Sequence, residues 1–398
     1  MNVCAIVSEF SPFHNGHKYL ISKLREKNIS HVVTIMSGNF TQRGDVAVLS
    51  KFARTKMALL NGVDLVIELP VCFSLSPAQN FAKAALFLIK SMGCVKTLGF
   101  GRECESIDKL INVSNKMDLN FDEGIKDILK MGVTFSKARQ IFFENLYGKD
   151  FSDIISKPNN ILAIEYIKAL DELNIDLNIE SVLREDVQHN DDFGIKNFAS
   201  SSFIRNAIYN KKDISKYIPQ KAYDILMSEI ETLKAPCFIE NGQRAILSVL
   251  RTLTSDDILN IQDVYEGLEN RIYKSIRQAG NIEELYLLAK TKRYTLARIR
   301  RIVLSSFLGI TKDLQNILPP YIRVLGFNNK GSEILKKMKS TATLPIITKY
   351  NDTKNLADQN VVKFFNMESI ASDLYSLFMP KPLECGQEMK NSVIVLKD

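Results

Sequence analysis

Two histidines stand three residues apart directly after the first apolar run of the chain, and they constrain the fold more than any other feature. The run, Val3 to Val7, has the length of a buried parallel strand, and a helical pattern begins near Gly16. His14 and His17 are therefore predicted at a helix N-terminus, where backbone N–H groups and the helix dipole attract anions. There they can donate hydrogen bonds to a phosphate that gains charge in a transition state. The alternative is a pair of histidines in a surface turn. Gly16 would leave room for a flat base against the backbone.

The first 210 residues alternate short apolar runs with helical patterns. This alternation is typical of an α/β fold with a Rossmann-like, doubly wound parallel sheet and right-handed crossovers. The predicted strands are Val3–Val7, His31–Met36, Val63–Pro70, Val95–Phe100 and Leu177–Leu183. A helix is predicted over 50–61, with Phe52, Ala53, Met57 and Leu60 facing inward and Lys51, Arg54 and Lys56 facing outward.

Three candidate ligand residues lie at or beyond the ends of predicted strands, where open α/β sheets bind ligands. Arg43 lies in the polar loop 37–45 and is predicted to contact an anion; otherwise it is a solvated loop charge. Gly101 follows the fourth strand and would let a ligand approach the backbone, or it is an ordinary turn glycine. Arg184 follows the fifth strand, just before the polar loop 185–192, and is predicted to face the ligand crevice.

A second phosphate-binding segment is predicted at residues 198–205. Ser200, Ser201 and Ser202 open a helix that carries Arg205, and serine hydroxyls at a helix start can hold phosphate oxygens. Taken alone, the segment is also explained by a simple N-cap. However, Ser-Ser-Ser-x-Ile-Arg and His-x-Gly-His resemble the two nucleotide-binding signatures of the nucleotidyltransferase superfamily, the second of which also occurs in class I aminoacyl-tRNA synthetases. The resemblance implies one nucleotide-binding domain over residues 1–210.

Strand-like runs disappear after residue 210, and amphipathic helical patterns continue to about residue 320, which predicts a helical domain over 211–320. Its segment 290–301 holds six cations and no acidic residue, and a basic segment with an aromatic side chain is a plausible contact for an RNA backbone. The alternative is an ordinary solvated face. The residues predicted to bind RNA are Lys292, Arg293, Arg298 and Arg301. Residues 321–398 mix both patterns and are predicted to form a small C-terminal α/β domain.

The composition is that of an ordinary globular protein, and no apolar run approaches the roughly 20 residues of a membrane span. Since the first strand begins next to Met1, we expect no signal peptide and a cytoplasmic protein. The six cysteines are scattered without metal-ligand spacing, so we expect buried free thiols and no metal site. A net charge of +7 is a weak indication of an anionic partner.

Several longer segments resemble the tRNA(Met) cytidine acetate ligase family. The two longest of these segments are Val7-Ser8-Glu9-Phe10-Ser11-Pro12-Phe13-His14-Asn15-Gly16-His17 and Met36-Ser37-Gly38-Asn39-Phe40-Thr41-Gln42-Arg43-Gly44. Shorter matches are Leu98 to Gly101, Pro158 to Leu162 and Thr291 to Thr295. The resemblance implies a ligase that activates acetate with ATP and acetylates the wobble cytidine of elongator tRNA(Met), forming AMP and pyrophosphate. Mg²⁺ would bridge phosphates, since it commonly binds through substrate oxygens.

The same resemblance implies an ATP site, and the predicted roles follow from it. His14 and His17 would stabilise the α-phosphate, and the three serines and Arg205 would hold the β- and γ-phosphates. Gly101, Arg184 and Asn159, or Asn160 if the alignment shifts by one, would complete the site. The continuous part of the site is Val7, Ser8, Glu9, Phe10, Ser11, Pro12, Phe13, His14, Asn15, Gly16, His17, Lys18, Tyr19 and Leu20.

Two other functions fit parts of the sequence. A small-molecule nucleotidyltransferase, which adenylylates a phosphorylated cofactor precursor, would share both signatures but would need neither the helical domain nor the basic segment. A tRNA-binding protein with a degenerate nucleotide fold would not need intact histidines and serines. Nothing in the sequence indicates an oligomeric state.

Overall fold

The computed structural model describes residues 1–117, 121–184, 197–265, 267–354 and 356–397, so the loop 185–192 lies outside the described residues. Its centre is one sheet in the order β10-β8-β5-β2-β1-β6-β7, with β9 paired to β8. The run from β5 to β7 is parallel, whereas β8 pairs with β5 in the antiparallel direction, so the predicted α/β class is confirmed with one reversed edge. The strands are β1 (Val3–Ser8), β2 (His31–Ser37), β5 (Leu65–Leu69), β6 (Thr97–Arg102), β7 (Asn178–Leu183), β8 (Ile322–Phe327), β9 (Ile346–Ile347) and β10 (Ile394–Val395).

Successive side chains of a strand point to opposite faces, and each face of this sheet builds its own apolar core. In β1, Val3 and Ala5 belong to one core, and Cys4 and Ile6 belong to the other. Helices α4 (Ala78–Met92) and α9 (Pro158–Glu172) contribute to the first core. The second core is covered by α1 (Asn15–Glu26), α2 (Lys51–Leu60), α10 (Ser201–Tyr209) and α11 (Gln220–Glu231).

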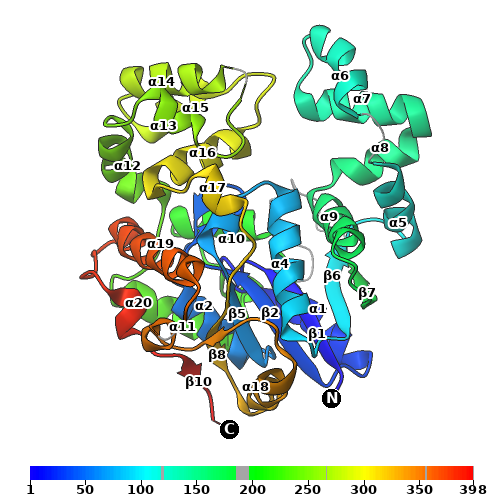
Figure 1. The fold of residues 1–398 in the computed structure, drawn as a ribbon, viewed down its shortest axis with the longest axis vertical. Helices are drawn as coiled ribbons and strands as arrows, with labels where there is room; N and C mark the ends of the chain where they lie inside the picture. The colour runs from blue at the N-terminus through cyan, green and yellow to red at the C-terminus, as the bar shows by residue number, and fades with distance from the viewer. Residues whose placement is uncertain (118–120, 185–196, 266, 355, 398) are drawn as a thin grey trace.

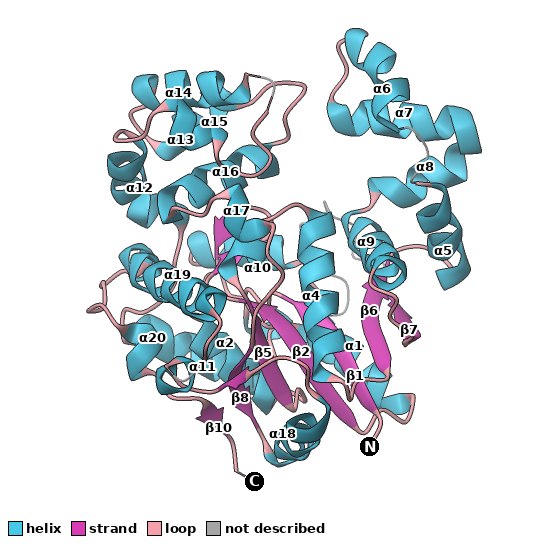
Figure 2. Ribbon diagram, in the orientation of Figure 1, coloured by secondary structure: helices cyan, strands magenta, loops and turns pink. Residues whose placement is uncertain are grey.

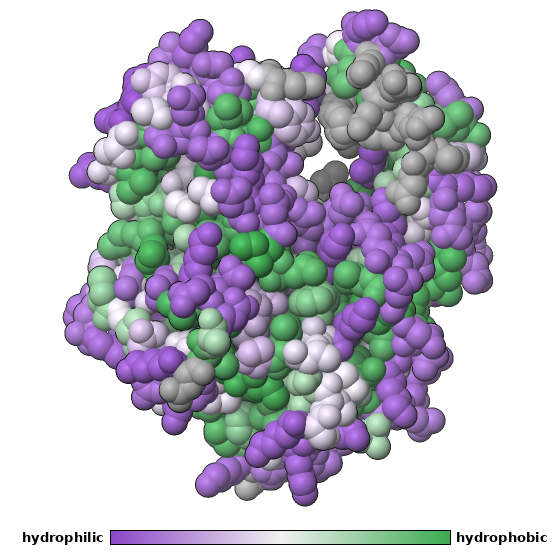
Figure 3. Space-filling view, viewed as in Figure 1, coloured by the Kyte–Doolittle hydropathy of each residue, from purple (hydrophilic) through white to green (hydrophobic). Residues whose placement is uncertain are grey.

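Two groups of helices project from the sheet on the side opposite the N-terminus (Figure 1 and Figure 2). An arm is formed by α5 (Ile107–Lys116), α6 (Phe121–Lys130), α7 (Phe135–Tyr147) and α8 (Lys149–Ser156). The helical lobe is formed by α12 (Gln243–Leu250), α13 (Ser255–Leu259), α14 (Leu268–Gln278), α15 (Ile282–Ala289) and α16 (Leu296–Leu308). Figure 3 shows an opening between the arm and the lobe, with many hydrophilic residues around it. The apolar core of the lobe is continuous with that of the sheet, so the lobe is packed directly on the first domain.

The C-terminal segment completes the sheet of the first domain. The sequence predicts a small α/β domain of its own at 321–398, but β8 pairs along β5, with Val66 opposite Gly326. Helix α18 (Asn329–Thr341) packs against β2, β5 and β8, and α19 (Gln359–Tyr375) contacts α16 of the lobe. The strands of this segment therefore belong to the sheet that carries the first histidine motif.

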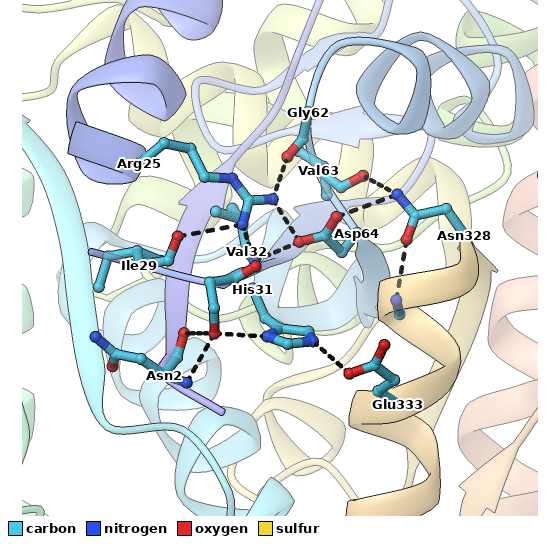
Figure 4. Close-up of polar contacts among 12 residues, drawn as sticks. Asn2, Arg25, Ile29, His31, Val32, Gly62, Val63, Asp64, Asn328 and Glu333 are labelled. Carbon is cyan, nitrogen blue, oxygen red and sulfur yellow. Dashed lines mark hydrogen bonds and ion pairs between the residues drawn. The ribbon is translucent and has the colours of Figure 1, made fainter. Parts of the chain in front are cut away.

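A polar cluster at the amino end of the sheet attaches α18 (Figure 4). The Asp64 carboxylate accepts hydrogen bonds from Val32 N at 2.7 Å, from Arg25 Nη2 at 2.5 Å and from Asn328 Nδ2 at 3.1 Å. The backbone of α18 comes so close that a Cβ at Gly331 would lie 2.0 Å from the carbonyl oxygen of Asp64. This end of the sheet is thus closed, and the opposite end remains for ligands.

The predicted outward orientation of Lys51 and Arg54 is wrong, since both side chains are fully buried. Lys51 Nζ lies 2.6 Å from Glu68 Oε1 and 2.6 Å from Glu388 Oε2. Burying a cation is tolerated when it is paired, and here one partner comes from the C-terminal segment. Lys56 is exposed as predicted, and among the cysteines Cys385 is exposed rather than buried. None of the described helices is long and apolar enough to cross a membrane.

Candidate nucleotide site

The candidate site lies between β1 and β6, where the order in which the strands are added to the sheet changes direction. The chain proceeds outward from β1 through β2 to β5, and it then returns to place β6 and β7 on the other side of β1. Such a switch point leaves a crevice at the carboxyl ends of the two neighbouring strands. The first histidine motif follows β1, and Gly101 lies near the end of β6, so both predicted elements border this crevice.

The backbone of the α1 N-terminus fixes the tautomers of both histidines. His14 is the N-cap, and its Nδ1 accepts a hydrogen bond from Gly16 N at 3.0 Å. His17 Nδ1 accepts one from His14 N at 3.2 Å. A neutral imidazole whose Nδ1 accepts must carry its proton on Nε2. The two rings are stacked with centroids 3.7 Å apart, so each presents an Nε2–H donor from neighbouring positions.

Both imidazoles are held in the neutral form. Burial lowers the pKa of His14 from 6.5 to about 3, and the nearby guanidinium groups of Arg184 and Arg205 act in the same direction. Burial also lowers the pKa of His17, with contributions from His14 and Arg184. The two neutral imidazoles offer hydrogen-bond donors, and Arg184 and Arg205 add two permanent positive charges. A polyphosphate would balance these charges.

The depressed pKa of His14 predicts an acid-sensitive fold. Between pH 6.5 and about 3 the unfolded chain binds a proton that folded His14 does not bind, so stability is complete above pH 6.5 and falls as the pH decreases through this window. At pH 5 the loss from this one group is about 2 kcal/mol. In urea titrations at pH 8 and pH 5, His14→Gln should lose less free energy of unfolding than the wild type by about this amount. Equal losses in both proteins would contradict the assignment.

The serine-rich segment 198–205 lies beside the first histidine motif. His14 Nε2 lies 3.0 Å from Ser201 Oγ, and Arg205 Nη1 donates to Ser11 O at 3.0 Å. Ser200 serves as the N-cap of α10, since its hydroxyl accepts from Phe203 N at 3.1 Å and lies 3.0 Å from Ser202 Oγ. The N-termini of α1 and α10 thus converge, so the two predicted phosphate-binding segments lie beside each other.

Gly101, Asn159 and Arg184 also lie together. Arg184 Nη1 donates to Asn159 Oδ1 at 3.1 Å, and a Cβ at Gly101 would lie 3.3 Å from Arg184 Cγ. Glu103 was not identified from the sequence, and it belongs to the same cluster. Its carboxylate accepts hydrogen bonds from Asn159 N at 3.1 Å and from Asn159 Nδ2 at 2.8 Å. Asn160 is fully buried, and its amide is used by Glu103 N and by a backbone carbonyl. Both amides are hydrogen-bonded within the protein, but Asn159 is only half-buried, so it is the more accessible of the two to a ligand.

The other residues of 7–20 mostly shape the site. Phe10, with a positive φ of 48°, places its ring edge-on to His17 at 4.9 Å. Asn15 Nδ2 donates to the carbonyl oxygens of Asn197 at 2.8 Å and Lys216 at 2.9 Å, so it anchors the chain before and after α10. A Cβ at Gly16 would lie 2.9 Å from His14 Cε1, so this glycine makes room for the His14 imidazole. The sequence alone predicted only that Gly16 makes room for a nucleobase.

For the remaining members of this stretch the structure gives position and burial. Val7 and Ser8 end β1, Pro12 and Phe13 are buried in the turn, Lys18 is exposed, and Tyr19 and Leu20 are half-buried on α1.

Arg54 is a second residue that sequence reasoning missed. Its buried guanidinium donates to Leu49 O at 2.9 Å, to Glu9 O at 2.6 Å and to Ser37 O at 3.1 Å, and it also binds Gly38 O. It therefore joins the carboxyl ends of β1 and β2. The side chain of Arg43 is exposed, in the turn of the hairpin formed by β3 (Phe40–Thr41) and β4 (Asp45–Val46).

The side chains of the basic segment differ in how far they are exposed. Lys292 and Arg293 are exposed. In contrast, Arg298 Nε donates to Asp263 O at 3.0 Å and its guanidinium lies 4.3 Å from the centre of the Tyr265 ring, while Arg301 Nη2 lies 3.0 Å from Asp263 Oδ2. Arg298 and Arg301 thus make contacts within the lobe.

Three comparisons with known proteins bear on this site. A family model described as HIGH Nucleotidyl Transferase matches residues 1–390. A protein named tRNA(Met) cytidine acetate ligase from Thermoanaerobacter sp. (strain X514) is 37% identical over 405 residues, covering 100% of both chains. One of the same name from Thermosipho africanus (strain TCF52B) is 34% identical over 421 residues, covering 99% of this chain and 100% of the relative.

Solved structures give the same result. The crystal structure of apo Thermotoga maritima TmcAL (form I) matches with a TM-score of 0.92 at 31% identity, covering 100% of both chains. The structure of the same protein bound with alpha-thio ATP matches with a TM-score of 0.90 at 31% identity, again covering 100% of both chains.

Proposed function

This chain belongs to the tRNA(Met) cytidine acetate ligase family within the HIGH nucleotidyl transferases, and on that premise we propose that it activates acetate with ATP and acetylates the wobble cytidine of elongator tRNA(Met). The observation that carries the proposal is the convergence of His14, His17, Ser201, Arg184 and Arg205 at one crevice. These groups are donors and cations, which suits a triphosphate.

The first half-reaction makes acetyl-adenylate. An acetate oxygen attacks the α-phosphorus of ATP, the bond to the β-phosphate breaks, and pyrophosphate leaves with the electron pair. Charge grows on the non-bridging α-phosphate oxygens as the new bond forms. We propose that the Nε2–H groups of His14 and His17 donate to these oxygens, and that Ser201 and Arg205 hold the departing phosphates.

The second half-reaction transfers the acetyl group. The exocyclic N4 of cytidine attacks the acetyl carbonyl carbon, the bond to the adenylate oxygen breaks, AMP leaves with the electron pair, and N4 releases one proton. Lys292 and Arg293, exposed on the helical lobe, are proposed to contact tRNA phosphates. Arg298 and Arg301 support this surface through Asp263.

Mg²⁺ fits the site as an ion carried by the phosphates. Among the described residues, no group of three His, Cys, Asp or Glu side chains is placed to hold a metal ion. An ion that binds through phosphate oxygens needs no such group, and it would lower the negative charge of the triphosphate. The proposal therefore includes ATP with Mg²⁺, acetate and tRNA as reactants in the cytoplasm.

A direct experiment combines two measurements. Purified protein, ATP and acetate should release pyrophosphate in an acetate-dependent manner, and mass spectrometry of nucleosides from added tRNA should reveal N4-acetylcytidine. A small-molecule nucleotidyltransferase would instead adenylylate a phosphorylated acceptor without acetate or tRNA. Pyrophosphate release that ignores acetate, with unmodified tRNA, would reject the proposal in favour of that alternative.

A further inference from the structure

The β3–β4 hairpin of the first domain touches both the nucleotide site and the helical lobe. On the side of the nucleotide site, Glu9 Oε1 accepts a hydrogen bond from Gln42 N at 2.7 Å. On the side of the lobe, a Cβ at Gly44 would lie 2.5 Å from the backbone N of Arg301 and 2.6 Å from the carbonyl carbon of Arg300. The tip of the hairpin is thus in direct contact with the backbone of α16, with no space for a side chain.

An aromatic contact joins the same two parts a second time. The ring of Phe378, from the C-terminal segment, lies edge-on to Phe40 of β3 at 6.2 Å and edge-on to Phe307 of α16 at 6.0 Å. A Cβ at Gly242, just before α12, would lie 2.5 Å from the same ring. Phe378 is fully buried, so the hairpin and the lobe pack against the same apolar side chain without solvent between them.

The base of the hairpin is anchored to the first domain. Ala47 N donates to Asn39 O at 2.9 Å, and Ala47 O accepts from the Tyr375 hydroxyl at 2.7 Å. Asn39 Oδ1 in turn accepts from Lys51 N at 2.8 Å. A steric conflict at the tip would therefore displace α16 and the lobe more readily than the hairpin.

We propose that this hairpin positions the helical lobe, and the tRNA bound to it, over the acetyl-adenylate, with Gly44 as the positioning residue. The inference rests on the proposed function and assigns the hairpin to its second half-reaction. The cytidine N4 must meet the acetyl carbonyl carbon in a narrow geometry, and a displacement of about 1 Å can cost about 10²-fold in rate. Adenylation needs only groups of the first domain.

Gly44→Ala tests the proposal because its Cβ forces such a displacement. At saturating tRNA, single-turnover transfer from preformed acetyl-adenylate should slow by about 10–100-fold. Acetate-dependent pyrophosphate release without tRNA should stay within about twofold of the wild type, since the variant removes no group that contacts ATP. A change in the transfer rate constant without an equal change in adenylation is a readout that general destabilisation does not produce.

Gly309→Ala is the matched control. Gly309 ends α16 and has the same φ of +73° as Gly44, but a Cβ at this position would have no atom of the described residues within 4 Å. Both variants therefore place an alanine at the same positive φ, and only Gly44→Ala carries the steric conflict. Gly309→Ala should transfer acetyl groups at the wild-type rate. Equal transfer rates in the two variants, or parallel loss of both half-reactions in Gly44→Ala, would overturn the proposal.

Phe40→Leu provides a second route if Gly44→Ala does not fold. It weakens the contact with Phe378 without adding volume, and it should slow transfer several-fold more than adenylation. Parallel loss of both half-reactions would again overturn the inference. Failure of the proposed function can be distinguished from failure of this inference, because without that function the wild-type protein itself would form no N4-acetylcytidine.

Discussion

Replacing His17 by alanine is expected to slow acetate-dependent pyrophosphate release by about 10²–10³-fold, because one preorganised donor to the α-phosphate is lost. His17 Nδ1 is already used by His14 N at 3.2 Å, so the Nε2–H is the group that remains for a ligand. Affinity for tRNA should be nearly unchanged, since the exposed cations Lys292 and Arg293 lie on the helical lobe. Pyrophosphate assays and filter binding on the same preparation measure the two effects.

His17→Glu separates catalysis from helix capping. A glutamate at this third helical position also accepts from the N-cap backbone, as in a capping box, but it offers no donor to phosphate. If His17 acts only as a cap, the glutamate should restore both the melting temperature and the activity lost in His17→Ala. If it acts on phosphate, the glutamate should restore only the melting temperature. Near-normal pyrophosphate release by His17→Ala would refute the catalytic role outright.

Charge reversal at Lys292 and Arg293 is expected to weaken tRNA binding by about 10–100-fold at low salt, because two phosphate contacts become repulsive. The slope of log affinity against log salt should shrink by roughly 0.7–0.9 per lost contact. Pyrophosphate release without tRNA should not change. Reversal of Arg298 and Arg301 is a poorer test, since both bind Asp263 and their loss would also destabilise the lobe.

Lys336→Glu with Lys337→Glu is the control for overall charge. Both lysines are exposed on α18, which packs near the amino end of the sheet, away from the nucleotide site. The control changes the net charge by the same amount as reversal at Lys292 and Arg293. Similar losses of tRNA affinity in the two double variants would show that binding depends on total charge, and the basic segment would then have no special role.

Local patterns predicted most of the fold and the centre of the candidate site. The strand β1, the turn and the helix α1 are encoded within about 25 residues, so apolar periodicity and capping chemistry were sufficient to locate His14 and His17. The paired signatures assigned Ser201 and His14 to one nucleotide-binding domain, and the structure brings them together although 187 residues separate them.

What failed depended on partners distant in the sequence. Lys51 was predicted to face solvent because helical periodicity has no information about Glu388, which pairs with it in the core. Arg54 was missed for a similar reason, since its acceptors include the backbone carbonyls of Glu9 and Ser37, which lie 45 and 17 residues away in the sequence. The contacts of Arg298 and Arg301 with Asp263 were not predicted either, because a basic run does not reveal that Asp263 lies beside it, and contact of these two residues with RNA stays a prediction.

The reversed strand β8 also bears on how this protein can be made. A ribosome produces β5 long before residues 322–327 emerge, and until then the edge of β5 is an unpaired template for aggregation. Lys51 meanwhile lacks Glu388, one of the two carboxylates that lie closest to it in the core. The nascent sheet therefore stays incomplete until residues 322–327 have left the exit tunnel, well after the other strands that flank β5 and β1 have been made.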